Sequence, residues 1–216
     1  LVRLNLRPGK WVEDLAPSPD LEGKTVLTSF DYSTMPHTLI RSDKTGTGGR
    51  YIFYFIPASG ASYAGASGDV VGPKWGERLV GDIAASPDPS FVGYPINDIF
   101  EWRQSLGLAS GQNFILSERG RYMNFWPITV ATALDDARID VAAAGGNMSN
   151  FHSIRVLQDE LVGFTSEGQF TLSSSGATLT PQSVSLTQTT KFESSETAQP
   201  VNIGSSLAFA TSRGPY

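Results

Sequence analysis

Few residues in this chain have the types and the spacing that catalysis or metal binding requires. The two histidines, His37 and His152, have no second histidine or carboxylate at the spacing of a metal site, so we interpret both as structural or surface residues. The acidic stretch Asp135–Asp140 could offer paired carboxylates, either to a cation or as a general acid and base. It lacks the alternating oxygen ligands and the central glycine of a calcium loop, so we interpret it as a solvated loop with an internal ion pair.

Nucleophiles and phosphate-binding loops are also missing from the sequence. There is no cysteine, which excludes disulfides, thiolate ligands and a cysteine nucleophile. No Gly-x-Ser-x-Gly elbow marks a reactive serine. The segment Gly46–Gly49 lacks the Lys-Ser/Thr pair that completes a phosphate loop. The chain is therefore predicted not to be an enzyme and to hold no cofactor and no metal.

The composition argues against tight binding of nucleic acid. The net charge is -5 and the pI is about 5.0, whereas a groove that grips phosphates must be basic. Aromatic clusters at Phe100–Trp102 and Tyr122–Trp126 could stack on bases, but little positive charge surrounds them, so we interpret them as core residues. No apolar run approaches the ~20 residues of a membrane span, so no membrane insertion of its own is expected.

The residue pattern predicts a mainly β fold. Gly (22) and Pro (13) are frequent and charged residues make up only 17%, which is typical of a turn-rich β protein. Alternating apolar residues predict strands over Val2–Leu6 and Lys24–Phe30, with a turn at Arg7–Lys10. The aromatic and β-branched run Tyr51–Ile56 predicts another strand. The Ala/Ser/Gly-rich stretch Pro57–Pro73 is predicted to be a flexible surface loop.

Two regions are expected on either side of a proline-rich connector, Ser86–Ser90: a β-rich platform region, 1–90, and a second region, 91–216. The second region carries a weak repeat, since the segment from Gly107 aligns with that from Gly163 at an offset of 56. A third copy, Ala208–Tyr216, follows at an offset of 46. Each copy reads as a hairpin, and hairpins recurring every ~40–50 residues are typical of β-propeller blades. Chance similarity among hairpins is the alternative.

A propeller blade has four strands and a closed propeller ~4–8 blades. The repeat therefore predicts two propeller-like blades and part of a third, which indicates a fragment of a longer chain.

An ordered series of short motifs resembles the tail nozzle proteins of short-tailed bacteriophages (podoviruses), a family also called tail tubular protein B. The series includes Tyr32–Arg41, Trp75–Asp82, Ile96–Arg103 and Tyr122–Pro127. The stretch Ala58–Gly72 is longer than the family leads us to expect, which leaves the surface shape there open. The motif residues that we expect to have structural roles are Met35, Pro36, His37, Trp75, Arg78, Asp82, Phe91, Asn97, Arg103, Asn124, Phe125, Asp136 and Asp140.

The resemblance implies a structural protein of the virion, assembled in the host bacterial cytoplasm. Six copies would form a tapering tube below a ring-shaped tail adaptor, with tail fibres near the junction. The genome would pass through the tube without binding tightly. We expect acidic residues to outnumber basic ones on the lumen wall, because an acidic wall repels phosphates and lets the duplex slide.

Two other functions compete with this one. An isolated β-propeller that binds host-surface glycans would be a closed monomer with exposed aromatic residues at one end. A tail-associated hydrolase would need two carboxylates ~5–10 Å apart in a cleft, and only Asp135, Asp136, Asp140 and Glu101 could supply them.

Overall fold

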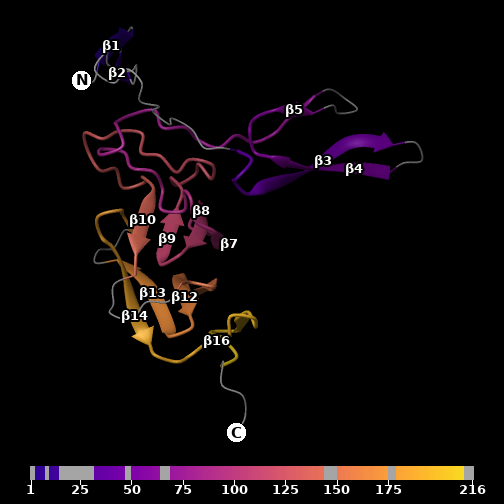
Figure 1. Cartoon of the computed structure of the whole chain (residues 1–216), viewed down its shortest axis with the longest axis vertical. Coiled ribbons are helices and arrows are strands. Elements are labelled where there is room, and N and C mark those ends of the chain that lie inside the picture. Colours follow the sequence, from indigo (N-terminus) through magenta and orange to yellow (C-terminus); the bar gives the residue numbers. More distant parts are fainter. Residues whose placement is uncertain are drawn as a thin grey trace. The chain divides into compact units, whose positions relative to one another are not determined.

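The computed structural model describes residues 3–7, 10–14, 32–46, 50–63, 69–143, 150–174 and 179–211. Every regular element in these ranges is a β-strand, so the predicted mainly β class is confirmed. Within them there is accordingly no helix that could cross a membrane. The chain divides into two units, Leu1–Leu79 and Val80–Tyr216, which are described separately (Figure 1). The boundary predicted at residue 90 lies inside the second unit.

The described residues of the first unit form paired strands. Arg7 and Lys10, the two ends of the predicted turn, face each other across the β1–β2 ladder, and residues 8 and 9 lie outside the described residues. The predicted strand Tyr51–Ile56 is confirmed within β4, whereas the predicted strand Lys24–Phe30 lies outside the described residues. The three antiparallel pairs are β1 (Arg3–Arg7) with β2 (Lys10–Asp14), β3 (His37–Gly46) with β4 (Arg50–Pro57), and β5 (Ser62–Tyr63) with β6 (Val70–Val71).

The Ala/Ser/Gly-rich stretch predicted as a flexible loop forms a narrow ladder over its described residues, 57–63 and 69–73. Gly60 donates its N–H to the Pro73 carbonyl (2.9 Å) and Gly72 donates to Ala61 (3.0 Å). Ala58 is fully buried. Backbone pairing of this kind needs no apolar side chains, and small residues let the two segments approach closely.

The second unit is built from two four-stranded antiparallel sheets in which strands adjacent in sequence are adjacent in space (Figure 1). The two-residue turns of their first and second hairpins recur at an offset of 55, from Arg103-Gln104 to Gln158-Asp159 and from Gly111-Gln112 to Ser166-Glu167. The sheets consist of β7 (Ile96–Trp102), β8 (Ser105–Ser110), β9 (Asn113–Leu116) and β10 (Ile139–Ala142), and of β11 (Ser153–Leu157), β12 (Glu160–Thr165), β13 (Gly168–Ser174) and β14 (Val184–Thr190).

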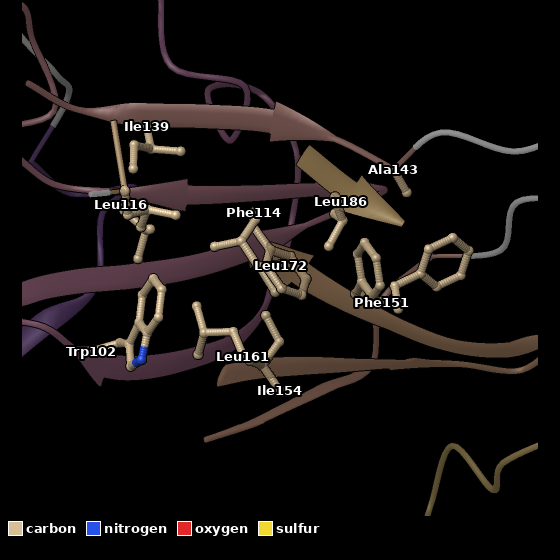
Figure 2. Packing of buried hydrophobic residues seen from close by; sticks show 13 residues of the cluster. Trp102, Phe114, Leu116, Ile139, Ala143, Phe151, Ile154, Leu161, Leu172 and Leu186 are labelled. Atoms are coloured by element: carbon tan, nitrogen blue, oxygen red, sulfur yellow. The ribbon is translucent and has the colours of Figure 1, made fainter. Parts of the chain in front are cut away.

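The two sheets share one hydrophobic core (Figure 2). Side chains of the first sheet, such as Trp102, Phe114 and Leu116, face Ile154 and Leu161 of the second. The remaining buried members of this core are Ala109, Ile139, Ala143, Phe151, Phe170, Leu172, Leu179 and Leu186.

The core uses opposite faces of the two equivalent sheets. Residues 55 positions after Trp102, Phe114 and Leu116 point away from the shared core, because a shift of one residue exchanges the two faces of a strand. The sequence alignment at an offset of 56 was therefore one residue out of step with the backbone. It matched residues that face the shared core, such as Phe114 with Phe170 and Leu116 with Leu172, and not residues that stand equally far from a turn. The sheets consequently stack front to back.

A third hairpin continues the series. Its strands are β15 (Val201–Ile203) and β16 (Ser206–Ala208), and its Gly204-Ser205 turn follows the Gln158-Asp159 turn at an offset of 46. Phe209 packs on Phe164, with ring centroids 5.4 Å apart, on the face of the second sheet that points away from the first. Most of the third copy predicted from the sequence, residues 212–216, lies outside the described residues.

Candidate functional site

The histidine in the second unit belongs to a buried polar chain. His152 Nε2 lies 3.0 Å from Ser194 Oγ, and that hydroxyl donates to the Thr165 carbonyl at 2.7 Å. Burial lowers the pKa of His152. Ser194 is almost fully buried and its proton is committed to a carbonyl, so the pair fastens segment 191–195 to the second sheet and does not present a nucleophile. Nothing in the sequence could have paired residues 42 positions apart.

The carboxylates considered as an acid–base pair have separate partners. Asp140 accepts the N–H of Ser90 at 2.8 Å and the amide of Asn113 at 3.2 Å. Glu101 accepts the Tyr122 hydroxyl at 2.9 Å, which raises the pKa of Tyr122.

Asp135 and Asp136 are exposed and border a cavity of about 20 Å³, which has room for roughly one water. In the part of the chain that the structure describes, no group of three or more His, Cys, Asp or Glu side chains could hold a metal ion.

The most regular polar contacts connect the turns of successive repeats. The Arg103 guanidinium donates to both carboxylate oxygens of Asp159, at 3.3 and 2.7 Å, and lowers the pKa of that carboxyl. In the next repeat, Gln158 donates its side-chain amide to the Ser205 carbonyl at 3.3 Å. Arg103 and Gln158 both occupy the first position of their turns, and Asp159 and Ser205 both occupy the second. The same geometric step therefore relates the first hairpin to the second and the second to the third.

The first strands of successive repeats are joined in the same manner. Asp98 on β7 accepts the N–H of Ile154 (2.7 Å) and the Arg155 guanidinium (3.2 Å) on β11. Arg155 in turn donates to the Pro200 carbonyl (2.8 Å), just before β15. Asn202 on β15 donates back to the Val156 carbonyl (2.7 Å). A single arginine thus contacts the repeats on both sides, and this link was not predicted from the sequence.

Five of the motif residues expected from the resemblance lie in the first unit. Met35, Trp75 and Arg78 are buried, and the Met35 carbonyl lies 3.1 Å from His37 Nδ1. Pro36 precedes β3, and the exposed His37 ring stacks on Phe55 with centroids 5.2 Å apart.

The other motif residues occupy turns and joints of the second unit. Asp82 accepts the N–H groups of Ala84 and Ala85, which lowers its pKa and closes a tight turn. Asn124 makes three contacts around its own turn, to Glu118 and to both backbone groups of Trp126. Buried Phe91 and Phe125 meet edge to face at 5.2 Å, Asn97 donates to the Phe151 carbonyl, and the carbonyl of Asp136 accepts the Arg119 N–H.

Comparison with known proteins identifies the class to which this architecture belongs. Residues 3–216 match the family described as bacteriophage nozzle protein. The chain belongs to this family, and is thus a structural component of a phage tail. Over 185 residues it is 35% identical to the tail tubular protein gp12 of Escherichia phage T7. That alignment covers 86% of this chain and 20% of the relative, so the chain spans about a fifth of the relative's length.

Proposed function

We propose that this chain is part of a tail nozzle in which six copies form a tube that conducts DNA out of the particle during ejection. The observation that carries the proposal is the match to the nozzle family over residues 3–216. In this arrangement the tube joins a tail adaptor ring, tail fibres attach near the junction, and assembly takes place in the host cytoplasm before the virion is released.

Within each copy, the two four-stranded sheets and the β15–β16 hairpin are blades of a β-propeller. Two observations support this assignment. The sheets are antiparallel meanders that stack front to back, as neighbouring blades do. The contact between Arg103 and Asp159 recurs in the next repeat as a contact between Gln158 and Ser205, which supports a regular stacking step.

Both ends of the stack expose apolar residues at positions that a neighbouring blade would cover. Ile99 is 52% exposed, whereas its equivalent in the second sheet, Ile154, is 1% exposed against the first sheet. At the other end, Ile203 is 63% exposed, whereas its equivalent Trp102 is 5% exposed. In the proposal, other parts of the full-length protein supply the blades that cover these faces and close the ring.

The charge of the chain suits a conduit. With 16 basic and 21 acidic residues, it has no overall excess of positive charge with which to hold phosphates. Each such contact would increase the salt-dependent affinity for DNA and slow its passage. We place more acidic than basic residues on the lumen wall, so that the duplex slides.

Electron microscopy of the native full-length protein tests the proposal. Six-fold class averages with a central channel, and a light-scattering mass of six chains, are the expected results. A compact monomer at micromolar concentration would contradict the tube. A six-fold tube with a basic lumen would leave the nozzle assignment intact and contradict the charge argument alone.

A further inference from the structure

The β15–β16 hairpin lies on the first two strands of the second sheet. Asn202 on β15 donates to the Val156 carbonyl of β11 at 2.7 Å. Phe209, which follows β16, packs on Phe164 of β12 with ring centroids 5.4 Å apart. The hairpin thus stands to the second sheet as the first two strands of a further repeat, and the outer half of this sheet face lies beyond it.

The outer half of this face is lined by hydroxyl groups. Thr171 lies opposite Thr187 and Ser173 lies opposite Ser185 in the β13–β14 ladder, so these side chains share one side of the sheet. That side points away from the first sheet, because Leu172, the residue between Thr171 and Ser173, points into the shared core. We call it the hydroxyl face, and it consists of Thr171, Ser173, Ser185, Thr187 and Thr189.

In the contact between the first and second sheets, the equivalent position is covered by strands of the next repeat. Phe114 of β9 shares one core with Leu172 of β13 and Leu186 of β14 (Figure 2). β9 and β13 are equivalent, because each is the third strand of its sheet. The same step, applied once more, places the third and fourth strands of the third repeat over the hydroxyl face.

The sequence after β16 matches the sequence that opens β13. Residues 165–170 read Thr-Ser-Glu-Gly-Gln-Phe and residues 211–216 read Thr-Ser-Arg-Gly-Pro-Tyr, at the offset of 46 that relates the two hairpins. In the second repeat, the Thr165 hydroxyl donates to the Gly168 carbonyl (2.9 Å) and accepts the Glu167 N–H (3.3 Å). Threonine and glycine recur at the same positions, which indicates the same turn in the third repeat.

We propose that a strand beginning at Gly214 pairs with β16 and lies on the hydroxyl face. Residues 212–216 lie outside the described residues, so the repeat and the sequence carry the assignment. The inference rests on the propeller assignment in the proposed function and names the segment that completes the third repeat. It does not depend on the six-fold tube.

The free edge of β16 favours this segment over other occupants. Among the described residues β16 pairs with β15 alone, and an unpaired strand edge is unfavourable. A strand that follows through a two-residue turn is held at this edge by the chain itself, so closing the loop costs little entropy. A segment from the first unit or from another copy would have to displace it.

The register gives Tyr216 a defined place. Phe170 lies opposite Gly163 in the second repeat and is 2% exposed in the shared core. The equivalent pair in the third repeat is Tyr216 and Phe209. Phe209 already packs on the second sheet, so its cross-strand neighbour Tyr216 faces that sheet too. The tyrosine hydroxyl can exchange hydrogen bonds with the serine and threonine hydroxyls there, which a phenylalanine could not do.

Photo-crosslinking in the full-length protein tests the inference directly. Tyr216 is replaced by p-benzoylphenylalanine, and unlabelled and isotope-labelled copies are mixed, assembled, irradiated and analysed by peptide mass spectrometry. The expected products are crosslinks within one copy, from position 216 to β12, β13 or β14. Crosslinks that reach only the first unit, another copy or another tail protein would overturn the inference and identify the other occupant.

Hydrogen exchange of residues 206–208, which form β16, gives a second measurement. We expect Tyr216→Ser to speed the exchange of these amides roughly tenfold or more, because it removes the aromatic ring that holds the third strand in place. Arg213→Ala is the matched control and should leave exchange unchanged, since its equivalent Glu167 is an exposed turn residue. Unchanged exchange in β7 and β8 shows that the rest of the unit stays folded. Wild-type exchange of β16 in Tyr216→Ser would refute the pairing.

The outcomes separate the two proposals. A six-fold tube in which position 216 crosslinks away from the second sheet would retain the tube and refute the third strand. A monomeric protein in which position 216 crosslinks to the second sheet of its own copy would refute the tube and retain the strand.

Discussion

Gly163, at the centre of β12, is a position at which a single added methyl group should disrupt the shared core. A Cβ built there would lie 2.4 Å from Phe114 Cζ and 2.8 Å from Phe151 Cε1. Both rings are fully buried, and they pack against each other at a centroid distance of 4.6 Å. Neither ring can move away without displacing the shared core. We expect Gly163→Ala to reduce the free energy of unfolding by about 2–4 kcal/mol, at or above the upper end of the usual cost of overpacking.

Gly107→Ala provides the matched comparison. A Cβ at Gly107 would lie only 2.1 Å from Phe100 Cε2, which is a closer contact than at Gly163. Phe100, however, is only partly buried on the edge strand β7 and can turn toward solvent. The predicted cost is therefore smaller, about 1 kcal/mol or less. If distance alone decided the outcome, Gly107→Ala would be the worse variant.

Denaturant unfolding followed by tryptophan fluorescence measures both costs, since Trp102 lies in the same core. Phe114→Leu should partly rescue Gly163→Ala, with a coupling energy of at least about 1 kcal/mol in the double-mutant cycle. A Gly163→Ala variant as stable as the wild type, or a cycle without coupling, would refute the tight contact between the two sheets at this point.

Three further predictions concern polar contacts of the second unit. Asp98→Ala should reduce the free energy of unfolding by about 1.5–3 kcal/mol, because it leaves the Ile154 N–H without its acceptor and removes the carboxylate that pairs with the partly buried Arg155; a denaturant midpoint equal to that of the wild type would contradict this. Arg103→Ala should cost less than about 1 kcal/mol, because its pair with Asp159 is largely exposed, and a larger loss in the same assay would show that the turn contact is undervalued. The lowered pKa of His152 means that the unfolded chain takes up a proton as the pH falls through about 6.5 while the folded ring stays neutral, so stability is full above that pH and declines below it. His152→Gln should remove this decline in melting curves between about pH 7.5 and 5.5, and a variant that keeps the wild-type slope would assign the decline to other groups.

Local signals in the sequence were sufficient to predict individual strands and turns. The run Tyr51–Ile56 and the predicted turn at Arg7–Lys10 combine residue types that favour one backbone conformation, so they can be predicted without the rest of the chain. The ladder within residues 57–73 could not be predicted in this way. Its pairing depends on backbone hydrogen bonds such as that from Gly60 to Pro73, which leave no pattern of side chains behind.

The contacts between repeats show a second limit of sequence reasoning. Arg103 was named from the motif series, but its partner Asp159 was not, because the two are 56 residues apart. Asp98 and Arg155, which form the more buried link, lacked any local signal as a pair. Such contacts arise from the stacking step between sheets, and that step becomes visible only when the backbone is known.

Two exposed apolar residues of the second unit mark the ends of its stack. Ile99 and Ile203 stand at positions whose equivalents in a neighbouring repeat are buried by the adjacent sheet. In the proposed propeller, each of them is therefore covered by a further blade, which the remaining part of the full-length protein supplies.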